Sequence, residues 1–335
     1  MMDTGIHYLG RADVERAMPA LDEGLDLAER AMVALIDDAE LPPKIGVHPR
    51  PDGSFAHAMP ASLRPRDGDP GSAEDLLGIK WVMGFPANRA AGLAPVNAVV
   101  ILSDPATGLP TAILDGGPIT AQRTAAVSGV VVRRYAPATV GRPITVAIIG
   151  AGVQGRSHVE MSSVVLPGAH LVIHDRHAER ADTLASFAAA LPGVARATVA
   201  PAAREATRAA DVVITAVTFA RPEDRQPMTS DWLAPDALVV AVDYAAMCAA
   251  TTARDAALFL VDDRGQFLAN RDLGQFDGYP DPTATIGEAI RDDIVRPASG
   301  RVVATPLGVG LADLLFADAI VRRARDAGIG TFLAR

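Results

Sequence analysis

Two lysines stand out, because Lys44 and Lys80 are the only ones among the 31 lysine and arginine residues of the chain. Lys80 interrupts the apolar run 76–83, and the period-2 alternation of a strand places it on one face with Val82 and Gly84. A charge there requires a partner, and desolvation would lower its pKa towards the range useful for proton transfer. Lys80 is therefore a candidate catalytic residue. For both lysines, membership of a structural salt bridge is the alternative.

An arginine and an aspartate occupy two further notable positions. Arg123 comes three residues after Thr120, a plausible N-cap, so we expect a cation in the first turn of a helix. The helix dipole opposes a cation there by about 0.3–1 kcal/mol, and a bound anion would reverse the sign. Asp243 follows the apolar run 238–242, where a parallel sheet exposes catalytic groups. Together the cations suit a substrate carboxylate and Asp243 suits an amine, although each alone also fits a salt bridge.

A glycine-rich turn indicates a dinucleotide site. The apolar stretch 144–149 leads into Gly150-Ala-Gly152-Val-Gln-Gly155, and a helix-compatible segment follows. In this pattern the first glycine makes a tight turn, the second lets backbone approach a pyrophosphate, and the third lets the helix pack on the strand. The helix N-terminus then faces the phosphates. A structural glycine turn without a ligand is the alternative.

A carboxylate stands where the adenosine ribose of a dinucleotide would bind. Asp175 ends a second strand, 20 residues after Gly155, which is the expected spacing. It would repel the 2′-phosphate of NADP, whereas Arg176 would attract it, so we favour NAD and leave NADP open. Thr215 and Thr218 lie at the end of a further strand, at the sheet edge where ligands bind in such folds. Taken alone, either threonine is an ordinary loop hydroxyl.

The pattern of apolar residues changes near residue 120. Before it, a short helix from Asp13 and a longer one over 20–39 precede strands joined as hairpins. After it, strands and helices alternate, which predicts a parallel sheet with helices on both faces. We expect loops at 66–74 and 266–284 and a final amphipathic helix over 312–327. The expected strands are 46–48, 54–58, 78–85, 97–103 and 111–114, then 145–149, 170–174, 212–215, 238–242 and 258–261.

Composition narrows the class of protein. A length of 335 residues suggests about two domains, and the apolar runs are too short to cross a bilayer. The net charge of −9 argues against nucleic acid as a partner and favours a small molecule. The chain has a single cysteine, Cys248, which fits a reducing compartment and argues against a structural metal site. The first twenty residues show no export signal, so we expect a cytoplasmic location.

A series of different short motifs follows one another along the chain in a specific order. They include Gly78-Ile-Lys-Trp-Val-Met-Gly-Phe-Pro-Ala-Asn88, Ile119-Thr-Ala-Gln-Arg-Thr-Ala-Ala126 and Leu307-Gly-Val-Gly-Leu-Ala-Asp313, with further matches at 42–44, 59–61, 104–110, 150–155 and 328–331. In these motifs and in their order, the chain resembles the ornithine cyclodeaminase and mu-crystallin family. The resemblance implies an α/β fold with a Rossmann-type doubly wound parallel sheet and an α+β domain whose sheet is mainly antiparallel.

The same resemblance implies the organisation and the site. Residues 1–120, completed by 306–335, would form the substrate-binding and dimerisation domain of a homodimer, and residues 121–305 the NAD(P)-binding domain. Arginine usually occupies the position of Lys44 in that family, so this chain has a point charge in place of a bidentate fork. The implied catalytic residues are Lys80 and Asp243, the substrate-binding residues are Lys44, Met59, Lys80 and Arg123, and the cofactor-binding residues are Thr124, Gly150, Gly152, Val153, Gln154, Gly155, Asp175, Arg176, Thr215 and Thr218.

Three functions are compatible with this resemblance. The leading one is an NAD(P)-dependent oxidoreductase that acts on the C–N bond of an amino or imino acid by hydride transfer at Cα. Lys80 and Arg123 would then hold the substrate carboxylate, and Asp243 would orient the amine or a water. The second is an ornithine cyclodeaminase, although Asp243 is followed by Tyr-Ala-Ala here and by Pro-Gly-Lys in typical cyclodeaminases. The third is an NADP-linked binding protein like mu-crystallin.

Overall fold

The computed structural model describes residues 5–64, 74–218 and 220–334. The chain forms two compact units, Met1–Arg123 with Gly308–Arg335, and Thr124–Leu307. The boundary between the two units at Arg123 and Thr124 falls inside helix α3 (Gly116–Tyr135). All but the last residue of the loop expected at 66–74 lies outside the described residues. In the part of the chain that is described, no helix is both long and apolar enough to cross a membrane.

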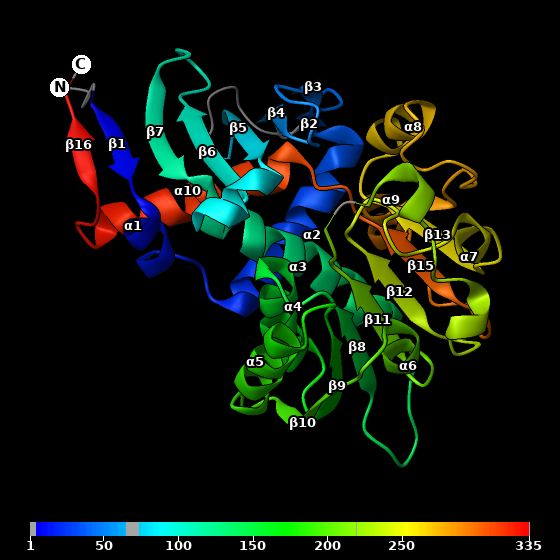
Figure 1. Ribbon diagram of the computed structural model, residues 1–335. Coiled ribbons are helices and arrows are strands. Elements are labelled where there is room, and N and C mark those ends of the chain that lie inside the picture. Colours follow the sequence, from blue (N-terminus) through cyan, green and yellow to red (C-terminus); the bar gives the residue numbers. More distant parts are fainter. Residues whose placement is uncertain (1–4, 65–73, 219, 335) are drawn as a thin grey trace. The chain divides into compact units, whose positions relative to one another are not determined.

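The first unit contains a mainly antiparallel sheet (Figure 1). Its strands run in the order β16-β1-β7-β6-β5-β4-β2, with β3 also paired to β4, and among the described residues of this sheet only β1 and β7 pair in parallel. Side chains alternate between a buried and a more open face along β5 and β6. The strands are β1 (Ile6–Leu9), β2 (Ala39–Glu40), β3 (Ile45–Val47), β4 (Phe55–Leu63), β5 (Leu76–Gly84), β6 (Val96–Ser103), β7 (Pro110–Asp115) and β16 (Thr331–Leu333).

Helices cover one face of this sheet. Helix α10 (Gly310–Asp326) packs on β4, β5 and β6, and helix α2 (Leu21–Asp37) packs on α10. The apolar side of α2, with Leu25, Ala28 and Met32, is buried there. The short helices α1 (Arg11–Arg16) and η1 (Pro86–Ala91) complete the unit. The C-terminal segment therefore returns to the sheet formed by the N-terminal third of the chain.

The second unit contains a parallel sheet with the strand order β10-β9-β8-β11-β12-β15-β13-β14. The direction of strand succession reverses between β8 and β11, which is where open α/β sheets bind their ligands. The central strands are buried along their whole length, except for the half-buried Thr145 at the start of β8. The strands are β8 (Thr145–Ile149), β9 (Ala169–His174), β10 (Val194–Val199), β11 (Val212–Thr215), β12 (Leu238–Ala241), β13 (Leu258–Val261), β14 (Ala284–Thr285) and β15 (Val302–Thr305).

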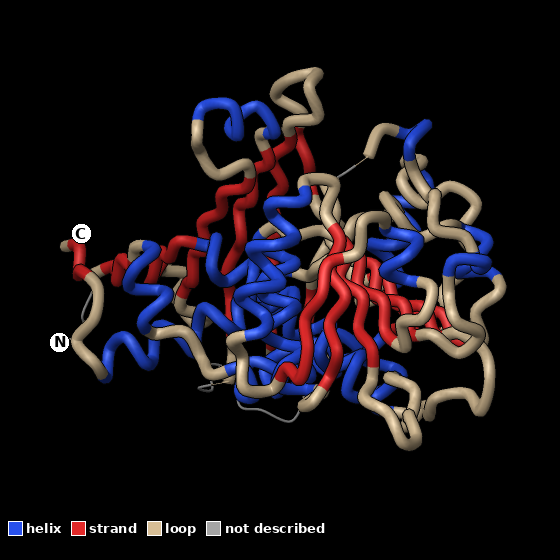
Figure 2. Tube along the Cα trace, turned by 60° about the horizontal axis from the view of Figure 1, so that its bottom comes forward, coloured by secondary structure: helices blue, strands red, loops and turns tan. Residues whose placement is uncertain are grey.

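Helices connect these strands and lie beside them (Figure 2). Helices α4 and α5 pack on β8, β9 and β10, whereas α6 packs on β8 and β9. This arrangement and the sheet of the first unit confirm the predicted α/β fold class. The helices are α4 (Val153–Val165), α5 (Ala178–Ala189), α6 (Ala203–Thr207), α7 (Ala250–Arg254), α8 (Arg264–Asp272) and α9 (Ile286–Arg291), with short 3₁₀ turns η2 (Pro222–Asp224) and η3 (Ser230–Trp232).

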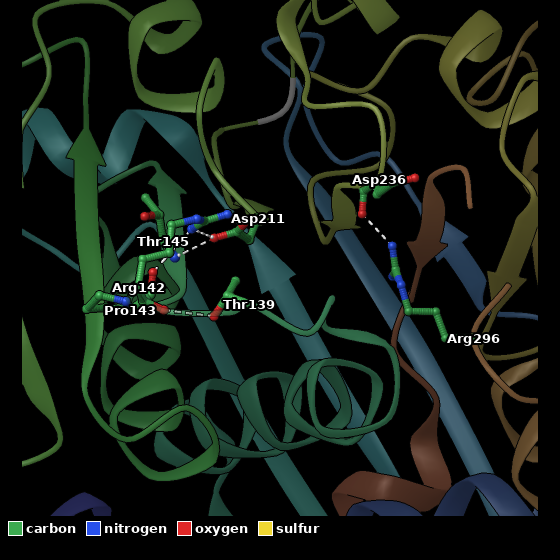
Figure 3. A network of polar contacts seen from close by, with 7 residues as sticks. All are labelled: Thr139, Arg142, Pro143, Thr145, Asp211, Asp236 and Arg296. Atoms are coloured by element: carbon green, nitrogen blue, oxygen red, sulfur yellow. Dashed lines mark hydrogen bonds and ion pairs between the residues drawn. The ribbon is translucent and has the colours of Figure 1, made fainter. Parts of the chain in front are cut away.

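A polar network ties the strands together at the amino edge of the parallel sheet (Figure 3). Arg142 donates from both Nη atoms to the two carboxylate oxygens of Asp211, each at 2.6 Å. The Thr145 N–H donates to the same carboxylate at 2.8 Å. The Arg296 side chain donates to the carbonyl of Asp236. Because Asp211 precedes β11 and Thr145 begins β8, this network fixes the register of the two strands between which the strand order reverses.

One expectation about this unit was wrong, and strands β10, β14 and β15 were not among the expected strands. The segment 266–284 is not a loop throughout, because α8 occupies its first part. The carboxylate of Asp263 caps that helix by accepting from the Gln266 N–H at 2.6 Å, a start signal that lies just before the segment. Strand β15 was not predicted, although it lies between β12 and β13. Its four residues follow an irregular stretch and show no alternation, since the strand is buried throughout.

Candidate active site

Three buried charged side chains meet in the first unit. Lys80 comes from β5, Arg123 from α3 and Asp313 from α10. The Lys80 Nζ lies 2.6 Å from Asp313 Oδ2, and the Arg123 Nε–H donates to Asp313 Oδ1 at 3.0 Å. The exposed fractions of Lys80, Arg123 and Asp313 are 1 %, 6 % and 0 %, respectively. We call these three residues the buried charge cluster.

The buried charge cluster has one positive charge more than it has negative charges when Lys80 is protonated. Burial, followed by the nearby Arg123, lowers the pKa of Lys80 to about 8, and Asp313 acts in the opposite direction. An uncompensated buried charge is costly, so the cluster stabilises an additional anion. A carboxylate is well matched, because a guanidinium presents a planar fork of donors to it.

Local backbone geometry makes room for the cluster. Gly308 has a φ of +85°, and a Cβ at this position would lie 2.5 Å from Arg123 Nη1. Only glycine therefore allows the chain to pass so close to the guanidinium in this conformation. Asp313 lies in the first turn of α10, where the helix dipole stabilises a carboxylate.

The position predicted for Arg123 in the first turn of a helix was wrong. Helix α3 begins at Gly116, and the Thr120 hydroxyl donates to the Gly116 carbonyl at 2.7 Å, so Thr120 is an interior residue and not the N-cap. Arg123 lies two turns into the helix, beyond the reach of the dipole at its end. The anion that balances its charge is the side chain of Asp313.

Two predicted substrate-binding residues lie beside Lys80 in the sheet. Met59 on β4 is directly opposite Lys80 on β5 and is buried against Val82 and Ala98. Lys44 immediately precedes β3 and is half-buried. Continuing the β3–β4 register by one residue places Lys44 opposite Met59, on the face that bears Lys80. Predicted residues 44, 59, 80 and 123 thus belong to one region of the first unit.

The glycine turn of the second unit is shaped for a pyrophosphate. Gly150 follows β8 with a φ of +109°, and a Cβ there would lie 2.5 Å from the carbonyl of Ala216, next to β11. A Cβ on Gly155 would lie 1.9 Å from the Gly150 carbonyl, so helix α4 packs directly on the turn. A Cβ on Gly152 would meet no atom within 4 Å. The open position is the one at which a phosphate approaches the backbone in this motif.

Asp175 lies against the glycine turn. One carboxylate oxygen accepts from the Ala151 N–H and the other from the His177 N–H, both at 2.8 Å. The carboxylate is thereby held in place, and its remaining lone pairs suit ribose hydroxyls. Arg176 is exposed.

The other predicted cofactor-binding residues are distributed over this unit. Val153 is 68 % exposed at the first turn of α4, which is unusual for valine and leaves an apolar surface open to a ligand. Gln154 is half-buried beside it, and Thr124 is half-buried on α3. Thr215 is buried at the end of β11, whereas Thr218 is exposed in the segment that follows.

Asp243 is a buried carboxyl group at the carboxyl edge of the parallel sheet, two residues after β12. Burial raises its pKa to about 6, while the Thr215 hydroxyl and the N–H groups of Val217 and Met247 act in the opposite direction. Among the described residues, no donor forms a hydrogen bond of ordinary geometry with either carboxylate oxygen. Asp243 can therefore gain or lose a proton near neutral pH, as an acid–base residue must.

The backbone after Asp243 is strained and firmly held. Tyr244 and Ala245 have φ values of 53° and 60°, a left-handed conformation that costs about 1–3 kcal/mol per residue. The Tyr244 hydroxyl donates to the Leu307 carbonyl at 2.7 Å, and Gln275 Nε2 donates to the Tyr244 carbonyl at 2.7 Å. Such strain persists only where the surroundings fix it, and it is typical of functional sites.

The structure thus places the predicted residues in two groups, one in each unit. Lys80 and Arg123 meet through Asp313, and Gly150, Asp175 and Asp243 lie along the carboxyl edge of the parallel sheet. Asp313 was absent from the candidate residues because it lies 190 residues from Arg123 in the sequence, within an apolar helix. Two signals pointed to it: its charge within the apolar run 310–317, and its place at the end of the family motif 307–313.

The fold and the glycine turn are typical of an enzyme that uses a dinucleotide, and the excess positive charge of the buried charge cluster can bind an anion. The profile of the ornithine cyclodeaminase/mu-crystallin family matches residues 7–263. The chain belongs to this family. The predicted family, enzyme class and NAD(P)-linked chemistry are thereby confirmed.

Individual relatives span the chain. The nodulation efficiency protein NfeD of Rhizobium meliloti is 32 % identical and covers 98 % of both chains. A Δ¹-pyrroline-2-carboxylate reductase of Burkholderia multivorans is 31 % identical over 77 % of this chain and 79 % of its own. The Δ¹-pyrroline-2-carboxylate reductase of Thermococcus litoralis, solved with NADH and L-proline, superposes with a TM-score of 0.83 at 25 % identity and covers 97 % of this chain and 99 % of its own.

Removal of the shared carboxylate should destabilise the first unit. We expect Asp313→Asn to lower the free energy of unfolding by about 3–5 kcal/mol, because two buried cations then lose their counter-charge. Asp318→Asn on the same helix breaks a pair with Arg322 that solvent reaches, so it should cost less than about 1 kcal/mol. Urea unfolding measures the free energy of unfolding of both variants. Equal losses in the two variants would contradict the role assigned to Asp313.

A methyl group at the open glycine should weaken dinucleotide binding without unfolding the protein. Gly152→Ala introduces no clash within the chain, so the melting temperature should change little, whereas the dissociation constant of NADH should rise at least about tenfold. Gly265→Ala, with its nearest contact at 3.5 Å, is the matched control and should leave both unchanged. Fluorescence titration with NADH measures the affinity. Unchanged affinity in Gly152→Ala would show that the pyrophosphate does not bind at this turn.

Proposed function

We propose that the protein reduces an α-imino carboxylate to the amino acid with NAD(P)H. The observation that carries this proposal is the buried charge cluster, whose unbalanced positive charge requires a carboxylate. Support for reduction as the reaction comes from the relatives, because two of those described above are Δ¹-pyrroline-2-carboxylate reductases. A cyclodeaminase and an NADP-linked binding protein are the alternatives.

Each part of the chain has a distinct task in this reaction. Lys80 and Arg123 bind the substrate carboxylate and thereby fix the orientation of the imine carbon, and Lys44 adds positive charge on the same sheet face. Asp243 orients the imine nitrogen and exchanges a proton with it, for which its raised pKa is suited. A dinucleotide held by the second unit would be the source of the hydride that the imine carbon accepts.

The dinucleotide would be held by the second unit. Gly150, Gly152 and Gly155 receive the pyrophosphate at the N-terminus of α4, and the Asp175 carboxylate accepts from the ribose hydroxyls. Because the Asp175 carboxylate is fixed beside the turn, it opposes the 2′-phosphate of NADP more strongly than the exposed Arg176 attracts it. We therefore favour NADH. Val153, Gln154, Thr124, Thr215 and Thr218 complete the proposed cofactor site.

The first unit would bind the substrate and form a homodimer. The sheet face opposite α10 bears apolar side chains that are only partly covered, such as Leu77 and Trp81, which are 36 % and 38 % exposed. Ile79, Met83, Val99 and Ile101 lie half-buried on the same face. A second copy that packs on this face would bury them. A cytoplasmic location stays a prediction from the sequence.

A charge on this face should separate the homodimer. Trp81→Glu places a carboxylate among apolar side chains, so we expect a monomer in light scattering coupled to size-exclusion chromatography, where the unchanged protein runs as a dimer. Val140→Glu is the control, because Val140 is 96 % exposed in a loop of the second unit. A dimer that survives Trp81→Glu would mean that the subunits associate through another surface.

The activity should depend on protonation of Lys80. In the assay, the protein is incubated with NADH and a panel of cyclic and acyclic imino acids. The absorbance of NADH and the release of ammonia are measured. Since Lys80 is charged below its pKa and neutral above it, we expect kcat/KM for the reduced imine to fall as the pH rises through about 8. Lys80→Met should lower kcat/KM at least about 100-fold and remove this alkaline limb, while the affinity for NADH is kept.

The other outcomes of this assay separate the alternatives. Ammonia released from ornithine without net change in NADH would indicate a cyclodeaminase. Ligand binding without turnover of any kind would indicate a binding protein. Wild-type activity in Lys80→Met would contradict the role of Lys80.

A further inference from the structure

We infer that Gln275 is a positioning residue for the proposed reaction, because its side-chain amide fixes the backbone turn after Asp243 and thereby the direction of the Asp243 carboxylate. The inference rests on the proposed function for the role of Asp243 and adds a residue to it. Gln275 is half-buried in the segment 273–283, which follows helix α8 and has no part in the proposed reaction otherwise.

The direction of the Asp243 carboxylate depends on its backbone. Asp243 is 2 % exposed, and among the described residues no donor forms a hydrogen bond of ordinary geometry with either of its carboxylate oxygens. Such a side chain takes its direction from its own Cα and from the packing around it. The Val242 N–H still donates to the Thr215 carbonyl at 3.0 Å, so strand β11 holds the chain up to the residue before Asp243. The turn that follows must hold the other side.

This turn has a conformation that its residues do not favour. Tyr244 and Ala245 are consecutive residues with φ values of 53° and 60°, and neither is a glycine. The left-handed conformation is unfavourable for such residues because Cβ comes too close to a backbone carbonyl. It therefore persists only where the surrounding structure holds it. The Ala246 N–H closes the turn by donating to the Asp243 carbonyl at 3.1 Å.

Gln275 acts at the centre of the turn. Its Nε2 donates to the Tyr244 carbonyl at 2.7 Å, and this carbonyl belongs to the peptide group that joins the two left-handed residues. The Tyr244 hydroxyl donates to the Leu307 carbonyl at 2.7 Å, which fixes the side chain of the same residue. Rotation of the central peptide group would break the bond to Gln275. The amide of Gln275 thus opposes the relaxation of the turn.

The segment that carries Gln275 is itself firmly held. Phe276 and Tyr279 are buried in the core of the second unit, and the Phe276 ring lies 5.9 Å from the Tyr244 ring between centroids. The Tyr279 hydroxyl donates to the Cys248 carbonyl at 2.6 Å. A group that orients a reacting residue needs such a rigid support. Further side chains donate to backbone carbonyls of this segment, namely those of Arg225, Gln226, Arg254, Arg264 and Arg271.

Replacement of the amide tests the effect on turnover. Gln275→Met keeps the length of the side chain and removes its donor. We expect kcat for imine reduction to fall at least about tenfold, because a small displacement of a reacting group is sufficient for such a loss. The dissociation constant of NADH should change less than about twofold, since the glycine turn is untouched. A smaller fall in kcat, or an equal loss of NADH affinity, would overturn the inference.

Asn270→Leu is the matched control. It also removes a side-chain amide of the second unit, one that donates to the Gln266 carbonyl at 2.8 Å within helix α8. It should leave kcat unchanged. A tenfold fall in this variant as well would overturn the inference, because loss of any such bond nearby would then be sufficient.

Amide hydrogen exchange tests the positioning without turnover. Exchange of the Ala246 N–H, which closes the turn, should be at least about tenfold faster in Gln275→Met than in Asn270→Leu. Gln275→Glu has the same shape as glutamine and also lacks the donor, so it serves if Gln275→Met does not fold. Unchanged exchange in a folded variant would overturn the inference. Faster exchange, together with no imine reduction by the unchanged protein, would overturn the proposed reaction alone.

Discussion

The first unit depends on one carboxylate that two cations share. Asp313 neutralises one charge of the pair formed by Lys80 and Arg123, and all three side chains are withdrawn from water. Such a cluster is stable only when its geometry is fixed, because any separation leaves a bare charge in a medium of low polarity. Strand β5, helix α3 and helix α10 are therefore held together by a polar requirement as well as by apolar packing. This requirement and the apolar packing of α10 together hold the C-terminal segment on the first sheet.

The parallel sheet was well predicted because its signals are local. The run 144–149, the glycine turn and Asp175 lie within about thirty residues, and their spacing is set by one βαβ unit. Strands β10 and β15 were missed for a different reason. Residues 194–199 are mixed in polarity at a sheet edge, whereas 302–305 are apolar but too short to distinguish from a buried loop. Pairing with β9, β12 and β13 makes them strands, and a single sequence does not display such pairing.

The charged site was predicted in its parts but not in its connection. Lys80 was identified by its conflict with an apolar strand, and that conflict is real, since its exposed fraction is 1 %. Arg123 was identified by a supposed conflict with a helix dipole, which disappears because α3 begins at Gly116. That argument for Arg123 was therefore wrong, although the structure does join Arg123 to Lys80 through Asp313. Asp313, which pairs with both cations, lies 190 residues from Arg123 in the sequence, and no periodicity or local spacing reports a contact of that kind.

The shared carboxylate also explains why a lysine is kept at position 80. A guanidinium stays charged under all conditions, so an arginine there would keep the excess positive charge permanently. An ammonium with a pKa of about 8 can release its proton above that pH, so the cluster does not keep its excess charge under all conditions. Lys44 lies at the half-buried margin of the same face, where this constraint is weaker.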